Sequence, residues 1–149
     1  MSDTDNNVSN AVRLGIDLGG TKIEAVVMAN DGRITERQRI DTPRDDYDAT
    51  VAAISELVDQ LPIPGDTPVG IGTPGAISLA TGLMKNCNST CLNGKPLPED
   101  LASTTGRPVR IANDADCFTL SEASDGAGIG AYSVFGVILG TGVGGGICI

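Results

Sequence analysis

Leu14-Gly15-Ile16-Asp17-Leu18-Gly19-Gly20-Thr21-Lys22 carries an apolar run into a carboxylate, two glycines and a hydroxyl. A second apolar run, Ile23 to Met28, follows directly. This order predicts a β-hairpin with a tight turn, because glycine adopts positive φ and lets other groups approach the backbone. The amides of the turn could bind an anion such as a phosphate, and Asp17 could hold a hydrated Mg²⁺. A plain turn with a solvated Asp17 is the alternative.

A similar loop occurs near the other end of the chain. Leu139-Gly140-Thr141-Gly142-Val143-Gly144-Gly145-Gly146 also follows an apolar run, Val134 to Leu139. Two glycine-rich loops, each placed after a strand-like segment, favour a nucleotide-dependent enzyme over two ordinary turns. We expect the strand that returns from the second loop to be represented only by residues 146–149.

Composition and charge narrow the class of protein. The 149 residues are 40% hydrophobic and 19% charged, which is typical of a globular protein. The net charge of −9 at pH 7 argues against nucleic acid as a partner. No apolar run approaches the roughly 20 residues of a membrane span, and residues 1–11 lack the apolar segment of a signal peptide. We therefore expect a cytoplasmic protein with a disordered tail at residues 1–11 and no membrane partner.

The chain contains four cysteines and no histidine. Nothing in the sequence indicates an oxidising compartment, so we expect reduced thiols. Cys87 and Cys91 could form half of a metal site, but the lack of histidine and of a second close cysteine pair favours incidental thiols. The lack of histidine also excludes Ser-His-Asp and Cys-His nucleophiles from these 149 residues.

Hydrophobic periodicity predicts an α/β chain in the order βββαβαβαβ. Asn30-Asp31-Gly32 is typical of a hairpin turn between the second and third strands. From Tyr47, apolar residues recur every three to four positions, which indicates an amphipathic helix that Pro62 ends. The predicted strands are 12–18, 22–29, 33–41, 69–72, 108–112 (buried on both faces) and 134–139, and the predicted helices are 47–61, 97–106 and one that follows 113–116 and ends at Gly126.

Three polar segments lie beside these elements. Thr73-Pro74-Gly75-Ala76 could line a ligand crevice or form an ordinary turn. Residues 84–90 are rich in amides and hydroxyls, which usually cap and turn but are also suited to sugar hydroxyls. Asn113-Asp114-Ala115-Asp116 follows a strand and opens a helix, where catalytic groups are often exposed. Asn113 or Asp114 could instead be the helix N-cap.

Four motifs in this order resemble the ROK family, which has repressor, open-reading-frame and kinase members. The motifs are Asp17–Lys22, Gly70–Gly75, Asn113–Asp116 and Leu139–Gly146. The resemblance implies an actin/hexokinase-like (ribonuclease H-like) fold with a mixed sheet and helices. It further implies an N-terminal α/β lobe at residues 12–115, followed at 116–149 by a connecting helix and the first strand and glycine loop of an incomplete second lobe.

Within this family the chain looks most like bacterial fructokinases of the mannofructokinase type, with N-acetylglucosamine kinases next. The resemblance lies in Thr42–Tyr47, Lys85–Thr90 with Leu92–Gly94, and Ser121–Gly126. It implies ATP-dependent phosphorylation of a hexose hydroxyl, with fructose as the first acceptor and N-acetylglucosamine or glucose as the alternative. Cys91 departs from the pattern, since the fructokinases usually carry Trp there. A repressor is disfavoured because only a dozen polar residues precede the first glycine loop.

The resemblance also implies roles for single residues. Asp114 matches the general base, and Asp116, two residues further into the helix, is expected to point elsewhere. Magnesium is expected at Asp17, and the zinc ligands of the complete family proteins have no counterpart here. The sugar-binding residues implied are Gly75, Asn88 and Asn113, and those implied for the ATP phosphates are Asp17, Gly19, Gly20, Thr21, Lys22, Gly140, Thr141, Gly142 and Gly144.

The 149 residues alone are expected to lack turnover, because both phosphate loops and an adenosine pocket must be held together to stabilise the transition state. At most, weak sugar binding is expected. The apolar segment from Val134 is expected to cause homodimerisation or strand-swapped self-association.

Overall fold

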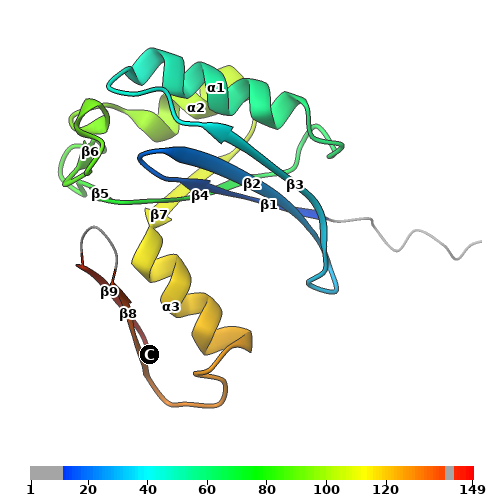
Figure 1. The fold of residues 1–149 in the computed structure, drawn as a ribbon, viewed down its shortest axis with the longest axis vertical. Coiled ribbons are helices and arrows are strands. Elements are labelled where there is room, and N and C mark those ends of the chain that lie inside the picture. Colours follow the sequence, from blue (N-terminus) through cyan, green and yellow to red (C-terminus); the bar gives the residue numbers. More distant parts are fainter. Residues whose placement is uncertain (1–11, 140–142) are drawn as a thin grey trace, which may run out of the picture.

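The computed structural model describes residues 12–139 and 143–149. Its centre is a five-stranded mixed sheet with the strand order β3-β2-β1-β4-β7 (Figure 1). The strands of this sheet are β1 (Val12–Leu18), β2 (Lys22–Ala29), β3 (Ile34–Asp41), β4 (Val69–Thr73) and β7 (Val109–Asn113).

The first hairpin forms as predicted. β1 pairs antiparallel with β2 in a register that runs from Val12↔Ala29 to Leu18↔Ile23, and β2 pairs antiparallel with β3. Because side chains alternate along a strand, Leu14, Ile16 and Leu18 all face the core.

The carboxyl ends of β1, β4 and β7 meet at one edge of the sheet. These three strands are parallel, with Asp17 opposite Gly72 and Thr73 opposite Asn113. Each strand ends in residues that the sequence identified as candidates for binding or catalysis. The parallel arrangement therefore gathers those residues at one place.

The helices α1 (Tyr47–Asp59) and α2 (Leu97–Thr105) cover one face of the sheet (Figure 1). Asp46 caps α1 by accepting a hydrogen bond from the amide of Ala49 at 2.9 Å. Gly106 ends α2 with φ = 66°. The core lies between the sheet and these helices. Its largest fully buried side chains include Leu18, Ile23, Ile54, Leu57, Val58, Leu97 and Leu101.

A second unit lies on the side of the sheet away from α1 and α2 (Figure 1). It consists of α3 (Asp114–Asp125) and the antiparallel pair β8 (Val134–Leu139) and β9 (Val143–Cys148). A Cβ at Gly146 would lie 2.6 Å from Oγ1 of Thr119 and 2.7 Å from the carbonyl oxygen of Ala115. The glycines of the β8–β9 pair thus allow the strands to approach α3 closely.

Three details differ from the sequence-based expectations. The short strands β5 (Ala76–Ile77) and β6 (Met84–Lys85) and the 3₁₀ turn η1 (Thr90–Leu92) were not predicted. β9 begins at Val143 and pairs with β8 along its length, so the expectation of only residues 146–149 was wrong. β7 is not buried on both faces, because Arg110 and Ala112 are exposed. Within the described residues, no helix is both long enough and apolar enough to cross a membrane.

Candidate active site

A cleft of about 840 Å³ lies at the sheet edge where the parallel strands end. Its walls come from the first hairpin turn, the loops after β3 and β4, residues 86–92, the start of α3 and the β8–β9 pair. The residues of the cleft that the sequence had identified are Gly20, Thr21, Gly75, Asn88, Asn113, Asp114 and Gly144. The hairpin turn and Asp114 therefore share one cleft.

Asp114 is half-buried at the first position of α3. Its Oδ1 accepts a hydrogen bond from the amide of Ala115 at 2.8 Å. Asn113 is the N-cap of α3, since its Oδ1 accepts from the same amide at 2.9 Å. The Nδ2 group of Asn113 donates to the carbonyl oxygen of Gly75 at 2.9 Å. Asn113 thus fixes both the helix start and the neighbouring loop, while Asp114 lines the cleft.

Asp116 lies outside this cleft. Its side chain is exposed, and its Oδ1 would lie 2.9 Å from a Cβ placed at Gly146 of β9. Because Asp116 is two residues further into the helix than Asp114, its carboxylate points toward the β8–β9 pair, and of these two acids only Asp114 lines the cleft.

Asp17 is the next-to-last residue of β1 and does not line the cleft. Although the side chain is open to solvent, partial burial raises the pKa of its carboxyl, and the charges of Asp114 and Glu24 raise it further. The Arg39 guanidinium opposes this shift. Asp17 and Asp114 are therefore two nearby carboxylates whose mutual repulsion a cation would relieve.

This carboxylate pair fits the way proteins bind Mg²⁺, which usually takes one or two carboxylates together with water and substrate phosphates. A dedicated protein cage is absent: the described residues contain no group of three or more His, Cys, Asp or Glu that could hold a metal ion. All four cysteines are free thiols. Burial raises the pKa of the Cys87 and Cys117 thiols, which makes them less reactive.

Neither Gly19 nor Gly20 of the hairpin turn has positive φ, so of the two properties that glycine offers a turn only close approach is used, and it is used at Gly19. A Cβ at Gly19 would lie 3.0 Å from the carbonyl oxygen of Lys22, to which the Gly19 amide donates at 3.0 Å. A Cβ at Gly20 would lie 3.5 Å from Oγ of Ser89. The turn tip therefore lies close to Ser89, which also lines the cleft.

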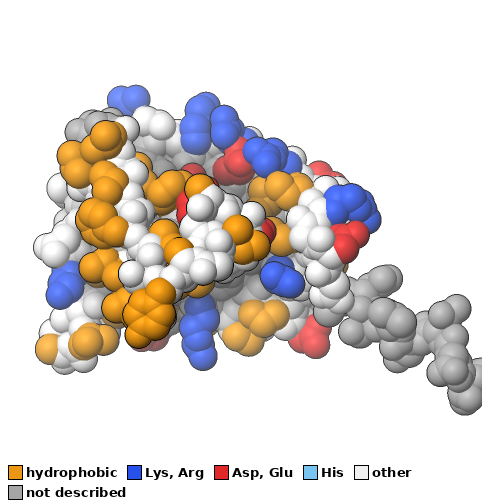
Figure 2. Space-filling view, turned by 90° about the horizontal axis from the view of Figure 1, so that it is seen from below, with side chains coloured by type: hydrophobic (Ala, Val, Ile, Leu, Met, Phe, Trp, Pro, Cys, Tyr) orange, Lys and Arg blue, Asp and Glu red, His pale blue; other side chains and the backbone are white. Residues whose placement is uncertain are grey.

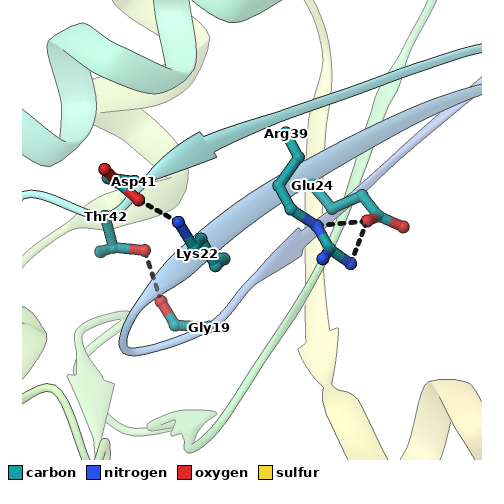
Figure 3. Close-up of polar contacts among 6 residues, drawn as sticks. All are labelled: Gly19, Lys22, Glu24, Arg39, Asp41 and Thr42. Atoms are coloured by element: carbon teal, nitrogen blue, oxygen red, sulfur yellow. Dashed lines mark hydrogen bonds and ion pairs between the residues drawn. The ribbon is translucent and has the colours of Figure 1, made fainter.

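Lys22 is directed away from the cleft. Its ammonium group forms an exposed ion pair with Asp41, its cross-strand neighbour on β3 (Figure 3). The hydrogen bond from Lys22 and its charge lower the pKa of Asp41. Lys22 does not line the cleft, and the strand register explains why.

Gly75 is a position that only glycine fits. Its φ is 108°, and a Cβ would lie 2.6 Å from Sγ of Cys87 and 2.8 Å from the carbonyl oxygen of Lys85. The side-chain amide of Asn93 holds Cys87 by two backbone hydrogen bonds, at 2.9 and 3.1 Å. The polar segment around Asn88 is thereby fixed against the loop after β4.

Other residues complete the cleft. Gly140, Thr141 and Gly142 lie outside the described residues. Thr42, Arg44 and Asp45 line the cleft although the sequence reasoning assigned them no role, and Ser89 and Cys91 line it too. Two signals pointed toward Thr42: the family resemblance of Thr42–Tyr47, and the dipeptide Thr42-Pro43, which follows β3 much as Thr73-Pro74 stands at the end of β4.

The chain is similar to sugar kinases of known sequence. The model of the ROK family matches residues 13–149. The N-acetyl-D-glucosamine kinase of Citrobacter koseri is 42% identical over 137 residues, which cover 91% of this chain and 45% of that protein. The N-acetylgalactosamine kinase AgaK of Shewanella sp. is also 42% identical over 137 residues, covering 91% of this chain and 44% of AgaK. This chain thus spans about half the length of the curated relatives it matches.

Solved structures of ROK-type kinases share the fold. The inorganic polyphosphate/ATP-glucomannokinase of Arthrobacter sp. strain KM matches with a TM-score of 0.78 and 34% identity, over 91% of this chain and 57% of that one. The ROK family glucokinase of Streptomyces griseus, solved with glucose and AMPPNP, also matches with a TM-score of 0.78 and 34% identity, over 93% of this chain and 44% of that one. These matches confirm the expected hexokinase-like α/β fold.

Proposed function

Because this chain belongs to the ROK family, we propose that it forms the N-terminal part of an ATP-dependent hexose kinase. The supporting observation is the single cleft that contains the hairpin turn at Gly20 and Thr21, the loop at Gly75 and the carboxylate of Asp114. In this proposal residues 12–115 form the first lobe and residues 116–149 begin the second.

N-Acetylglucosamine is the acceptor we propose, with glucose next. The resemblance of short motifs had favoured fructose, but the two 42% identical relatives are named as kinases of N-acetylated hexosamines. The two solved structures are named as a glucomannokinase and a glucokinase. Fructose therefore has no support from these relatives.

Asp114 is the proposed general base. Its Oδ1 is held by the Ala115 amide, so the carboxylate has a fixed orientation from which it can accept the proton of the acceptor hydroxyl. Such a base typically contributes about 10²–10⁴-fold to the rate. Gly75 and Asn88 provide the proposed sugar-binding wall, and Asn113 supports it through the Gly75 carbonyl.

The donor phosphates are proposed to lie against the hairpin turn, where Gly20 and Thr21 line the cleft. Gly19 shapes this turn, and Gly140, Thr141, Gly142 and Gly144 form the proposed second phosphate loop. Asp17 is the proposed Mg²⁺ ligand, and a bound Mg²⁺ would neutralise phosphate charge. Lys22 supports the turn through Asp41 and is not proposed to reach the phosphates.

A chimaeric kinase tests this function. It joins residues 12–149 of this chain to the part of the Citrobacter koseri kinase that follows the matched region. We expect ADP release with N-acetylglucosamine, less with glucose and least with fructose. Equal or greater release with fructose would contradict the proposed acceptor.

Asp114→Asn in this chimaera is expected to lower kcat by about 10²-fold or more. Asp116→Asn is the matched control, since Asp116 lies outside the cleft, and it should change kcat little. Undiminished turnover in Asp114→Asn would remove Asp114 from the base role. The 149-residue chain alone is expected to bind sugar weakly without releasing ADP.

A further inference from the structure

Two buried threonines hold the start of the hairpin turn. Oγ1 of Thr42 donates to the carbonyl oxygen of Gly19 at 2.8 Å (Figure 3). Oγ1 of Thr73 donates to the carbonyl oxygen of Leu18 at 3.3 Å. The amide of Thr42 also donates to the carbonyl oxygen of Thr21 at 3.0 Å. Three backbone carbonyl oxygens at the turn, those of Leu18, Gly19 and Thr21, are thus tied to the residue that follows β3 and to the last residue of β4.

The hydrogen bond from Thr73 is buried, and the one from Thr42 is partly buried. Thr42 is 9% exposed and Thr73 is fully buried. A buried carbonyl oxygen that loses its donor cannot be compensated by solvent, so removal of either hydroxyl carries a cost. The turn is therefore constrained from both sides, by the residue after β3 and by the last residue of β4.

Each of these threonines precedes a proline that lines the cleft. Pro43 leads into Arg44 and Asp45, and Pro74 leads into Gly75. Proline fixes its own φ and restricts the preceding residue to extended conformations. Each Thr-Pro dipeptide therefore couples the position of the turn to the path of a loop that forms another wall of the cleft.

We propose that Thr42 and Thr73, the threonine pair, are positioning residues that fix the phosphate-binding turn relative to the sugar-binding loop at Gly75. This inference deepens the proposed function and rests on it. Phosphoryl transfer depends on alignment of donor and acceptor, and a misplacement of about 1 Å can lower a rate by about 10²-fold. The threonine pair acts through the backbone of the turn, because both hydroxyls donate to carbonyl oxygens at its start.

Hydrogen exchange in the 149-residue chain tests the hold on the turn. Thr42→Val and Thr73→Val remove the hydroxyl and keep the branched shape. We expect the amides of residues 19–22 to exchange about two- to tenfold faster, the range that one lost hydrogen bond implies, relative to core amides of β1. Thr42→Ser and Thr73→Ser should restore the original rates, because they keep the donor.

Thr67→Val is the matched control. Thr67 is also buried and precedes a proline, but it does not line the cleft or contact the turn. It should leave the exchange of residues 19–22 unchanged even where the urea midpoint of the whole chain falls. Unchanged exchange at the turn in both cleft variants, or equal acceleration in Thr67→Val, would overturn the proposal.

Kinetics of the chimaeric kinase give the second readout. Thr42→Val and Thr73→Val should lower kcat/KM for ATP by about tenfold or more while KM for the sugar changes little. A loss confined to KM for the sugar would overturn the positioning role. Faster exchange at the turn, combined with no sugar-dependent ADP release by the unmutated chimaera, would support the hold on the turn and overturn the proposed function.

Discussion

At the scale of single residues, the carboxylate of Asp17 lowers the stability of the fold and is also the proposed Mg²⁺ ligand. Asp17 lies opposite Gly72, and a Cβ at Gly72 would lie 4.0 Å from Cα of Asp114. Asp17 also lies opposite Glu24, whose own charge is paired with Arg37 and Arg39. The carboxylate of Asp17 is thus placed beside other acids, which costs stability in the absence of a cation.

Asp17→Asn is expected to raise the free energy of unfolding at pH 7. Partial burial and the charge of Asp114 raise the pKa of Asp17, so the folded chain favours its protonated form. The protonated carboxyl of Asp17 makes its full contribution to stability below the ordinary pKa of 3.8. This contribution is lost as the pH rises through the higher pKa of the folded state. Because Asp17 is exposed, the gain at pH 7 should stay below about 1 kcal/mol.

Urea unfolding at neutral pH and at about pH 3 measures this difference. The gain should vanish at about pH 3, because Asp17 in the original chain is then protonated and as uncharged as the amide that replaces it. Asp66→Asn, at an exposed acid outside the cleft, should show neither effect. A variant that is less stable than the original chain at neutral pH would contradict the prediction, and so would an equal gain at both pH values.

At the scale of elements, local pattern was sufficient where one face of an element is buried. The alternation of Leu14, Ile16 and Leu18 located β1, and the apolar spacing from Tyr47 located α1. Asn113 and Gly106 marked the start of α3 and the end of α2. These signals lie within each element, so they can be recognised in the sequence without knowing which other elements that element packs against.

Contacts between distant segments could not be predicted in this way. β5 and β6 are two residues each, and they form where Gly75 packs against Lys85 and Cys87. Lys22 is directed to Asp41 by a strand register that no motif encodes. The positions of Asp114 and Gly75 in one cleft likewise depend on parallel pairing of β4 with β7. The motifs were sufficient to identify these residues as candidates. The pairing of the strands determines which other residues each of them contacts.

Gly146→Ala should separate β9 from α3. A Cβ at this position would lie 2.6 Å from Oγ1 of the buried Thr119 and 2.7 Å from a helix carbonyl oxygen, so backbone must move. Overpacking of this kind costs about 1–3 kcal/mol. We expect a lower urea midpoint together with faster hydrogen exchange in α3 and β9.

Gly145→Ala is the matched control, because its Cβ would meet the exposed ring of Phe135 at 3.4 Å and the carbonyl oxygen of Gly136 at 3.6 Å, both without severe overlap. It should change the free energy of unfolding by less than about 0.5 kcal/mol. Equal stability of Gly146→Ala and the original chain would show that β9 does not pack on α3 as described.

At the scale of the whole molecule, the two faces of the β8–β9 pair differ in kind. One face presents glycines to α3, and the other presents exposed apolar side chains. Figure 2 shows hydrophobic side chains gathered on the side of the molecule where this pair lies. The exposed members are Phe135, Val137, Leu139, Val143 and Ile147. Contiguous apolar surface of more than a few hundred Å² usually marks an interface.

We therefore expect the 149-residue chain to self-associate through this face, with a second copy as the partner. Two identical apolar strand pairs are self-complementary, and each also offers open strand edges for antiparallel pairing. Light scattering should show dimers or larger species that dissociate on dilution. Phe135→Lys combined with Val143→Lys should raise the dissociation constant by more than about tenfold, since each buried apolar side chain contributes about 1.5–3 kcal/mol.

Leu79→Lys provides the control, because Leu79 is fully exposed in the connection between β5 and β6 and not on the β8–β9 pair. If loss of any exposed apolar side chain reduced association, this variant would dissociate the chain as well, and the β8–β9 face would have no special role. A monomer at all concentrations would exclude self-association altogether. If only Phe135→Lys combined with Val143→Lys dissociates the chain, the contact lies on the β8–β9 face, because the introduced charges oppose burial of that face and of no other.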